Sequence, residues 1–179
     1  MKESILNNKR ILAVDDEVDV LDTLQELLEG YSGLILDRAT DHHRGYHLLR
    51  SWTYDAVILD IMGVRGYELL NAAVHLGFPT IMLTAYAFTA DDLKQSIKYG
   101  AHTYIPKERM ADIPEFLEDV ITLSHSSNLK RMFQRLGELF NKRFGSQWME
   151  NEKTFWEKVA SGKYLPEPVI LKGKPRRTT

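Results

Sequence analysis

Along the first 124 residues, short continuous apolar runs alternate with longer segments in which apolar residues recur every three or four positions. The short runs predict strands buried on both faces, as in a parallel sheet, and the longer segments predict amphipathic helices. The predicted strands lie within residues 11–16, 34–37, 56–60, 80–85 and 102–107. Five such strand–helix units predict a doubly wound α/β fold with right-handed crossovers.

Start and stop signals bound the helices between these strands. Gly30 and Gly100 suit helix ends, and Thr89 suits an N-cap because two acidic residues follow it closely. We also expect one helix over residues 42–50 and another that starts at Asp112. The apolar side chains expected on the inner faces of the helices are Val18, Leu21, Leu24, Leu27, Leu28, Tyr46, Leu49, Tyr67, Leu70 and Val74. The second strand is expected over residues 34–36.

The last 55 residues show a different pattern. A helical stripe of apolar residues consists of Leu129, Met132, Phe133, Leu136, Phe140 and Phe144. Ser126, Ser127 or Asn128 is expected to cap this helix, and Gly145 to end it. A second helix, which stops near Gly162, is expected to hold Trp148, Phe155, Trp156 and Val159. The stripe predicts packing against the rest of the chain or against a second copy.

Charge changes sign at the same place as the pattern. The 179-residue chain has a net charge of −2, but residues 1–124 carry 11 basic and 20 acidic residues, whereas residues 125–179 carry 12 and 5. Such a change indicates a change of module. We therefore predict one domain over residues 1–124 and an extension of two helices and a basic tail over residues 125–179. Residues 164–168 read as extended and residues 172–177 as disordered.

Composition narrows the class of protein. An apolar fraction of 44% is ample for a packed core, and the absence of cysteine excludes disulfides and thiolate metal sites. Residues 1–10 are polar, and no window approaches the roughly 20 apolar residues of a membrane span. We therefore expect a soluble cytoplasmic protein that does not contact a membrane.

Polar residues follow four of the predicted strands at the point where each strand ends. They are Asp15 and Asp16, Asp60, Thr84 and Lys107. Because parallel strands open their carboxyl ends on one edge of the sheet, these side chains are expected to converge there. Such a set can bind a divalent cation and hold a phosphoryl group on a carboxylate.

Mg²⁺ prefers oxygen ligands. Asp15 or Asp16, together with Asp60, can supply carboxylate oxygens, and the backbone carbonyl of Met62 can supply another. Lys107 can reach a phosphate oxygen. The sequence therefore predicts a magnesium site beside Asp60.

Four motifs carry a resemblance to a known family. Val14–Glu17, Leu59–Met62, Leu83–Ala85 and Tyr104–Lys107 resemble, in order and at the ends of the predicted strands, the receiver domain of two-component response regulators. The resemblance covers about residues 8–124 and implies a flavodoxin-like sheet with the strand order 2-1-3-4-5.

The resemblance implies a role for each site residue. Asp60 is the phosphoacceptor and receives its phosphoryl group from a phosphohistidine on a sensor histidine kinase or phosphotransfer protein. Asp15 and Asp16 are the acidic pair that organises Mg²⁺, and Lys107 contacts the phosphoryl oxygens.

Thr84 and Tyr104 match positions whose coupled movement reports phosphorylation to the face made by the fourth helix, the fifth strand and the fifth helix. Residues 61–66 are about two residues shorter than the corresponding family loop and lack its usual proline. Met62 and Tyr86 occupy positions that tune dephosphorylation in the family, and their bulk predicts slow attack by water.

Several functions stay open at this stage. The leading one is a phosphorylation switch, not an enzyme, whose output is binding to a downstream protein or a second copy of the chain. The others are a transcriptional regulator whose basic extension contacts DNA, and a non-phosphorylated receiver that acts as a binding module. An aspartyl phosphatase is disfavoured because Met62 stands where such enzymes have a second acid. His43 and His47 have helical spacing, but we expect a solvated helix face and no metal site.

Overall fold

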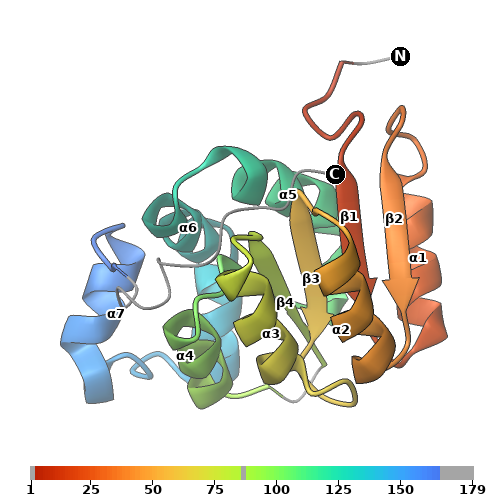
Figure 1. Ribbon diagram of the computed structural model, residues 1–179. Coiled ribbons are helices and arrows are strands. Elements are labelled where there is room, and N and C mark those ends of the chain that lie inside the picture. Colours follow the sequence, from red (N-terminus) through yellow and green to blue (C-terminus); the bar gives the residue numbers. More distant parts are fainter. Residues whose placement is uncertain (1–2, 86–87, 166–179) are drawn as a thin grey trace.

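The computed structural model describes residues 3–85 and 88–165 of the chain (Figure 1). Five parallel strands form one sheet with the order β2-β1-β3-β4-β5, which confirms the predicted flavodoxin-like topology. The strands are β1 (Arg10–Val14), β2 (Ile35–Ala39), β3 (Ala56–Asp60), β4 (Thr80–Thr84) and β5 (Thr103–Pro106). The central strand β3 and its neighbour β4 are buried along their whole length, as continuous apolar runs require.

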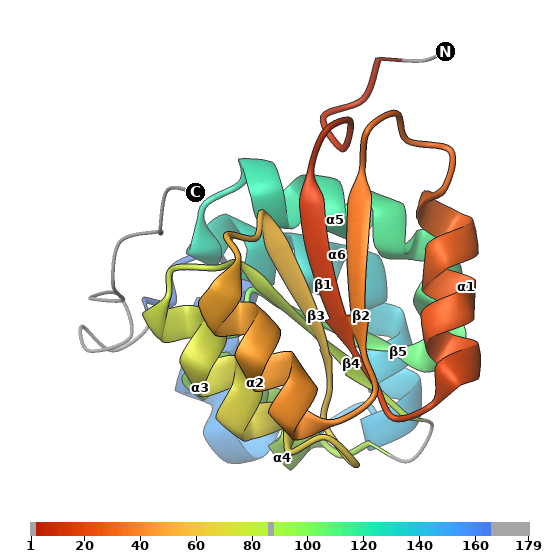
Figure 2. The same ribbon diagram turned by 45° about the vertical axis from the view of Figure 1, so that its right-hand side comes forward.

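Helices cover both faces of the sheet. The α-helices are α1 (Val18–Leu28), α2 (His42–Ser51), α3 (Gly66–His75), α4 (Ala90–Lys98), α5 (Ile113–Thr122), α6 (His125–Phe144) and α7 (Lys153–Ala160), and the short 3-10 helices are η1 (Lys107–Asp112) and η2 (Glu150–Glu152). In Figure 2, α2 and α3 lie on one face of the sheet, and α5 and α6 lie on the other. The predictions that residues 166–168 are extended and that residues 172–177 are disordered concern residues outside the described part of the chain.

Several predicted helix signals are found in place. The Thr89 side chain accepts a hydrogen bond from the Asp92 N–H at 3.1 Å, and Asp92 accepts one from the Thr89 N–H at 2.9 Å, which forms a capping box at the start of α4. Gly100 and Gly145 follow α4 and α6 with φ angles of 100° and 89°. These left-handed conformations favour glycine.

Two side chains predicted to face the core are exposed instead. The exposed fraction is 53% for Val18 and 41% for Tyr46. In α1, Val20 takes the inward position on the same face as Leu24 and Leu28, because residues four apart share a face. In α2, Gly45 faces the sheet, where an added Cβ would lie 3.0 Å from Val14, so Tyr46 points outward.

Three boundaries differ from the expectation. The second strand runs from Ile35 to Ala39, because pairing with β1 carries it past the apolar run into polar residues of a partly exposed edge strand. Ser124, not the following residues 126–128, caps α6 and accepts a hydrogen bond from the Ser127 N–H at 3.2 Å. Trp148 lies in a turn before α7 instead of within it.

The extension packs on the domain that precedes it. The inward face of α6 is fully buried and consists of Leu129, Met132, Leu136 and Phe140. These side chains belong to the same hydrophobic core as the sheet, and α6 contacts both α5 and β5. The predicted aromatic stripe is therefore a packing surface against the chain's own α/β domain.

Alanine substitutions at two glycines are expected to change the free energy of unfolding in opposite directions. A Cβ at Gly66 would overlap the carbonyl oxygen of Asp60, so Gly66→Ala is expected to lower the free energy of unfolding by about 1–3 kcal/mol. Gly137, within α6, has no atom within 4 Å of an added Cβ, so Gly137→Ala is expected to raise it by about 0.5–1 kcal/mol. Urea unfolding measures both values. Shifts of the same sign would contradict the close approach at Gly66 or the open space at Gly137.

Candidate functional site

Three aspartates meet at the carboxyl edge of the sheet. Asp15 directly follows β1, and Asp60 ends the neighbouring strand β3, whose register with β1 places Leu59 opposite Val14. One carboxylate oxygen from each of Asp15, Asp16 and Asp60 lies within 4.8 Å of the others. Asp15 and Asp60 are 2% and 4% exposed, whereas Asp16 is exposed to solvent. The fold therefore brings together the carboxylates that the strand ends predict.

Lys107 reaches the same edge from the end of β5. Its Nζ atom lies 3.0 Å from Asp15 Oδ2, 3.3 Å from Asp60 Oδ1 and 3.4 Å from Glu17 Oε1. Although burial alone lowers the pKa of Lys107, the surrounding carboxylates outweigh it and raise this pKa above its ordinary value. Glu17 was not among the predicted site residues, although its position directly after the acidic pair is a usable signal. Lys107 is held as a cation between Asp15 and Asp60.

Packing like charges together is unfavourable in this site. Burial raises the pKa of Asp60 to about 7, the negative charge of Asp15 adds to this rise, and Lys107 opposes it. Burial also raises the pKa of Asp15, against the opposing effects of the Glu17 N–H and Lys107. A divalent cation offsets such repulsion because it favours the ionised form of each carboxylate.

The donor set fits a magnesium ion. Asp15 Oδ1 accepts a hydrogen bond from the Glu17 N–H at 2.9 Å, which orients the carboxylate. Asp15 Oδ2 is buried and, apart from its ion pair with Lys107, has no hydrogen-bond partner among the described residues. A buried carboxylate oxygen beside two other carboxylates is a ligand set that hard cations prefer. Asp15, Asp16 and Asp60 are thus the residues that would hold Mg²⁺.

The loop after Asp60 passes close to the acidic pair. At Gly63 the φ angle is 82°, and an added Cβ would meet the Asp16 carboxylate, so this position requires glycine for both conformation and space. The Met62 side chain is 72% exposed. The roles of the Met62 carbonyl as a metal ligand and of its side chain in slowing hydrolysis remain predictions. Tyr86, the other residue expected to slow hydrolysis, lies outside the described residues.

The two expected switch residues lie on neighbouring strands. Thr84 ends β4 and is 5% exposed, and Tyr104 in β5 is fully buried. Burial raises the pKa of Tyr104, and the Thr84 hydroxyl opposes that rise. The Tyr104 hydroxyl has no regular hydrogen bond in the part of the chain that the structure describes. Its ring lies edge-on to Phe88, with 5.5 Å between the ring centroids.

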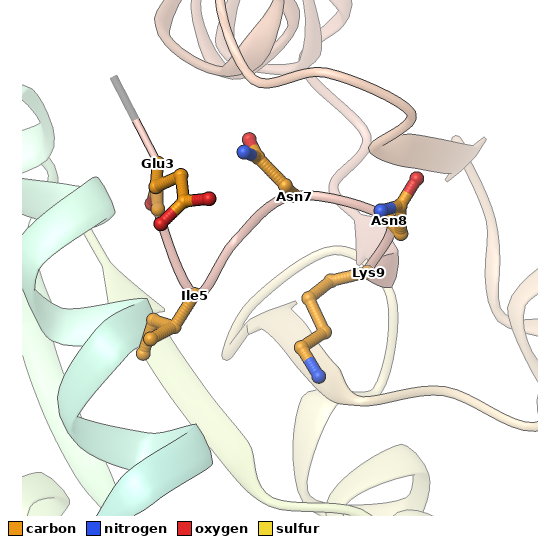
Figure 3. A pocket seen from close by; sticks show the side chains of 6 residues that line it. Glu3, Ile5, Asn7, Asn8 and Lys9 are labelled. Carbon is orange, nitrogen blue, oxygen red and sulfur yellow. The ribbon is translucent and has the colours of Figure 1, made fainter.

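A separate pocket opens at the other end of the sheet. It has a volume of about 580 Å³ and is lined by Glu3, Ser4, Ile5, Asn7, Asn8 and Lys9. Figure 3 shows that the labelled side chains all come from one stretch of chain. Because this stretch precedes β1, the pocket lies away from the carboxyl edge and takes no part in the acidic site.

Residues 11–118 match the response regulator receiver domain family, and the chain belongs to this family. It is 31% identical over 130 residues to the probable transcriptional regulatory protein SilR of Salmonella typhimurium, covering 68% of this chain and 56% of SilR. It is also 31% identical over 102 residues to the transcriptional regulatory protein CusR of Escherichia coli K12, covering 55% of this chain and 44% of CusR. The chain thus spans about half the length of these curated relatives.

Solved structures show the same fold. The signal receiver domain of an HD domain-containing protein from Pseudomonas fluorescens matches with a TM-score of 0.58 and 22% identity, covering 71% of this chain and 97% of that one. A response regulator from Thermotoga maritima matches with a TM-score of 0.56 and 22% identity, covering 64% of this chain and 98% of that one. Within the described residues, every helix is too short or too polar to cross a membrane.

Mg²⁺ is expected to raise the melting temperature more at pH 8 than at pH 5, because binding stabilises the folded state and needs ionised carboxylates. Without the ion, the raised pKa of Asp60 contributes stability below pH 3.8 that is lost as the pH rises through about 7. At pH 8 in chelator, the free energy of unfolding of Asp60→Asn is therefore expected to exceed that of the wild type by about 1–4 kcal/mol. The melting temperature of this variant is expected to respond weakly to Mg²⁺. An equal Mg²⁺ response in both proteins would remove Asp60 from the metal site.

Proposed function

We propose that the chain is a phosphorylation switch in which Asp60 accepts a phosphoryl group from the phosphohistidine of a sensor histidine kinase or phosphotransfer protein. The observation that carries this proposal is the approach of Lys107 Nζ to within 3.0 Å of Asp15 and 3.3 Å of Asp60 at the carboxyl edge of the sheet. Membership of the receiver family supports the same assignment.

These positions support direct transfer of a phosphoryl group to Asp60. An Asp60 carboxylate oxygen attacks phosphorus, the phosphorus–nitrogen bond of phosphohistidine breaks, and the released imidazole takes up a proton. Bound Mg²⁺ would neutralise charge on the phosphoryl oxygens, and Asp15 and Asp16 would hold it. Lys107, which pairs with Asp60 before transfer, then donates to a phosphoryl oxygen. The Thr84 hydroxyl donates to a second oxygen, which draws its side chain toward Asp60.

The output in this proposal is protein binding, to a downstream protein or a second copy of the chain. New contacts to the phosphoryl group shift an existing two-state equilibrium. The chain acts in the cytoplasm as a switch and not as an enzyme of another class. Met62, two residues after Asp60, offers no acid that would hydrolyse the acyl phosphate.

A transcriptional role is the second candidate, because the printed names of SilR and CusR describe transcriptional regulatory proteins. The described part of the extension favours protein output instead. Its Arg135 pairs with Glu115 and Asp119, and Arg143 pairs with Glu108, so these two cations face the receiver. An affinity for duplex DNA that falls steeply with salt would favour the transcriptional role.

Acetyl phosphate with Mg²⁺ is expected to add one phosphoryl group to the wild type and none to Asp60→Asn, because the amide lacks the nucleophilic oxygen. Intact-protein mass spectrometry measures the gain. Asp37→Asn is a matched control, because Asp37 is also a strand carboxylate but binds Arg10 at 2.8 Å, away from the acidic site. Labelling that persists in Asp60→Asn would assign the acceptor to another residue. A folded wild type that gains no mass, from acetyl phosphate or from kinases, would favour the binding module.

Lys107→Ala is expected to keep some labelling but to slow the gain of the phosphoryl group by roughly tenfold or more, because one charge-assisted contact that stabilises the transferring phosphoryl group is lost. The rate of mass gain after addition of acetyl phosphate and Mg²⁺ measures this effect. Lys98→Ala, a lysine on the exposed side of α4, is the control. Equal rates of labelling in the wild type and Lys107→Ala would show that the lysine does not stabilise the transferring phosphoryl group.

A further inference from the structure

The extension covers the face of the receiver formed by α4, β5 and α5. The amphipathic helix α6 lies against α5 and β5, and α7 packs on α6. Lys94 of α4 pairs with Glu152, which directly precedes α7. At the start of α6, the His125 ring stacks on the His102 ring, with 4.4 Å between the ring centroids. The face is therefore occupied by the chain itself.

An aromatic contact series leads from this covered face toward the acidic site. Phe88 lies between the Tyr104 ring on one side and α6 on the other. Its ring centroid is 5.5 Å from Tyr104, 5.2 Å from Phe144 and 6.3 Å from Phe140. Because Tyr104 is fully buried, its ring cannot turn outward unless Phe88 and α6 are displaced. Docked α6 therefore confines Tyr104 to its inward position.

Charged groups tie the same end of α6 to the segment that carries Lys107. Arg143 forms an ion pair with Glu108, the residue directly after Lys107, and its guanidinium group lies 5.6 Å from the Phe88 ring centroid. The end of α6 thus contacts both η1, which begins with Lys107, and the Phe88 ring. The opposite charges of the receiver and the extension favour this contact.

We propose that docking of the α6–α7 extension and phosphorylation of Asp60 stabilise each other through Phe88 and Tyr104. This inference rests on the proposed function and adds a regulated element to it. Phosphorylation draws the Thr84 hydroxyl toward Asp60 and leaves room beside the inward ring of Tyr104. Docked α6 favours that same ring position. Two events that favour one conformation are positively coupled, and the coupling is reciprocal.

The buried hydroxyl of Tyr104 explains why the coupling has an effect. Among the described residues this hydroxyl has no regular hydrogen-bond partner, which is costly for a buried group, so the inward position depends on compensating packing. Phe88 and α6 supply part of that packing in the unphosphorylated chain, and phosphorylation supplies a further preference. Phosphorylation is therefore expected to strengthen docking of the extension on the receiver and not to release it.

Hydrogen exchange of residues 125–144 in the full chain tests this inference. With excess acetyl phosphate and Mg²⁺, exchange in α6 is expected to slow by about tenfold in the wild type. Phe144→Ala, which removes a contact to Phe88, is expected to reduce the slowing to about twofold. Phe133→Ala is the matched control, because Phe133 packs on Phe140, Trp148 and Trp156 within the extension and not on Phe88.

Arg143→Gln is a second variant that leaves the core intact, and it is also expected to weaken the slowing. Intact mass of each sample reports the phosphorylated fraction. If the wild type gains a phosphoryl group but α6 exchanges at an unchanged or faster rate, the coupling is overturned and the proposed function stands. Equal slowing in Phe144→Ala and Phe133→Ala also overturns the route through Phe88. A folded wild type that gains no phosphoryl group from acetyl phosphate or from kinases overturns both proposals.

Discussion

The ion cluster of Asp15, Asp60 and Lys107 is the constraint around which the rest of the structure is arranged. Two carboxylates that are almost fully buried repel each other, and a single lysine at 3.0 and 3.3 Å is their compensating charge. The surrounding sheet fixes this geometry, and loss of Lys107 would leave two buried carboxylates without a compensating charge. The raised pKa of Asp60 is the measurable sign of that balance. An added cation would change this balance, because it favours the ionised form of both carboxylates.

Basic residues of the extension form ion pairs with acidic residues of the receiver. The acidic domain and the basic extension attract each other, but the specific contacts decide the position. Arg135 binds Glu115 and Asp119 on α5, and Arg143 binds Glu108 in η1. These pairs rim an apolar interface, so burial supplies most of the affinity and the charges select the orientation. The described part of the extension is thereby continuous with the core of the receiver.

Much of the fold follows from local patterns. The convergence of Asp15, Asp60 and Lys107 was predictable because apolar runs end in polar residues and parallel strands share an edge. The strand order came from the resemblance to receiver domains and not from these patterns. The errors came where tertiary contacts override periodicity. Gly45 faces the sheet in place of Tyr46 because the helix approaches Val14 too closely for a side chain. The second strand extends into polar residues because β1 offers hydrogen-bond partners there.

The sequence alone determined which polar residues lie at the carboxyl edge of the sheet, because each follows or ends a predicted strand. They are Asp15, Asp16, Asp60, Thr84 and Lys107. It also determined that residues 129–144 form an amphipathic helix. Only the tertiary structure decided what that helix covers. Periodicity specifies which face of a helix is apolar, but the surface that receives it depends on shape and charge from residues distant in sequence. The contact of Phe88 with both Tyr104 and α6 is likewise visible only in the tertiary structure.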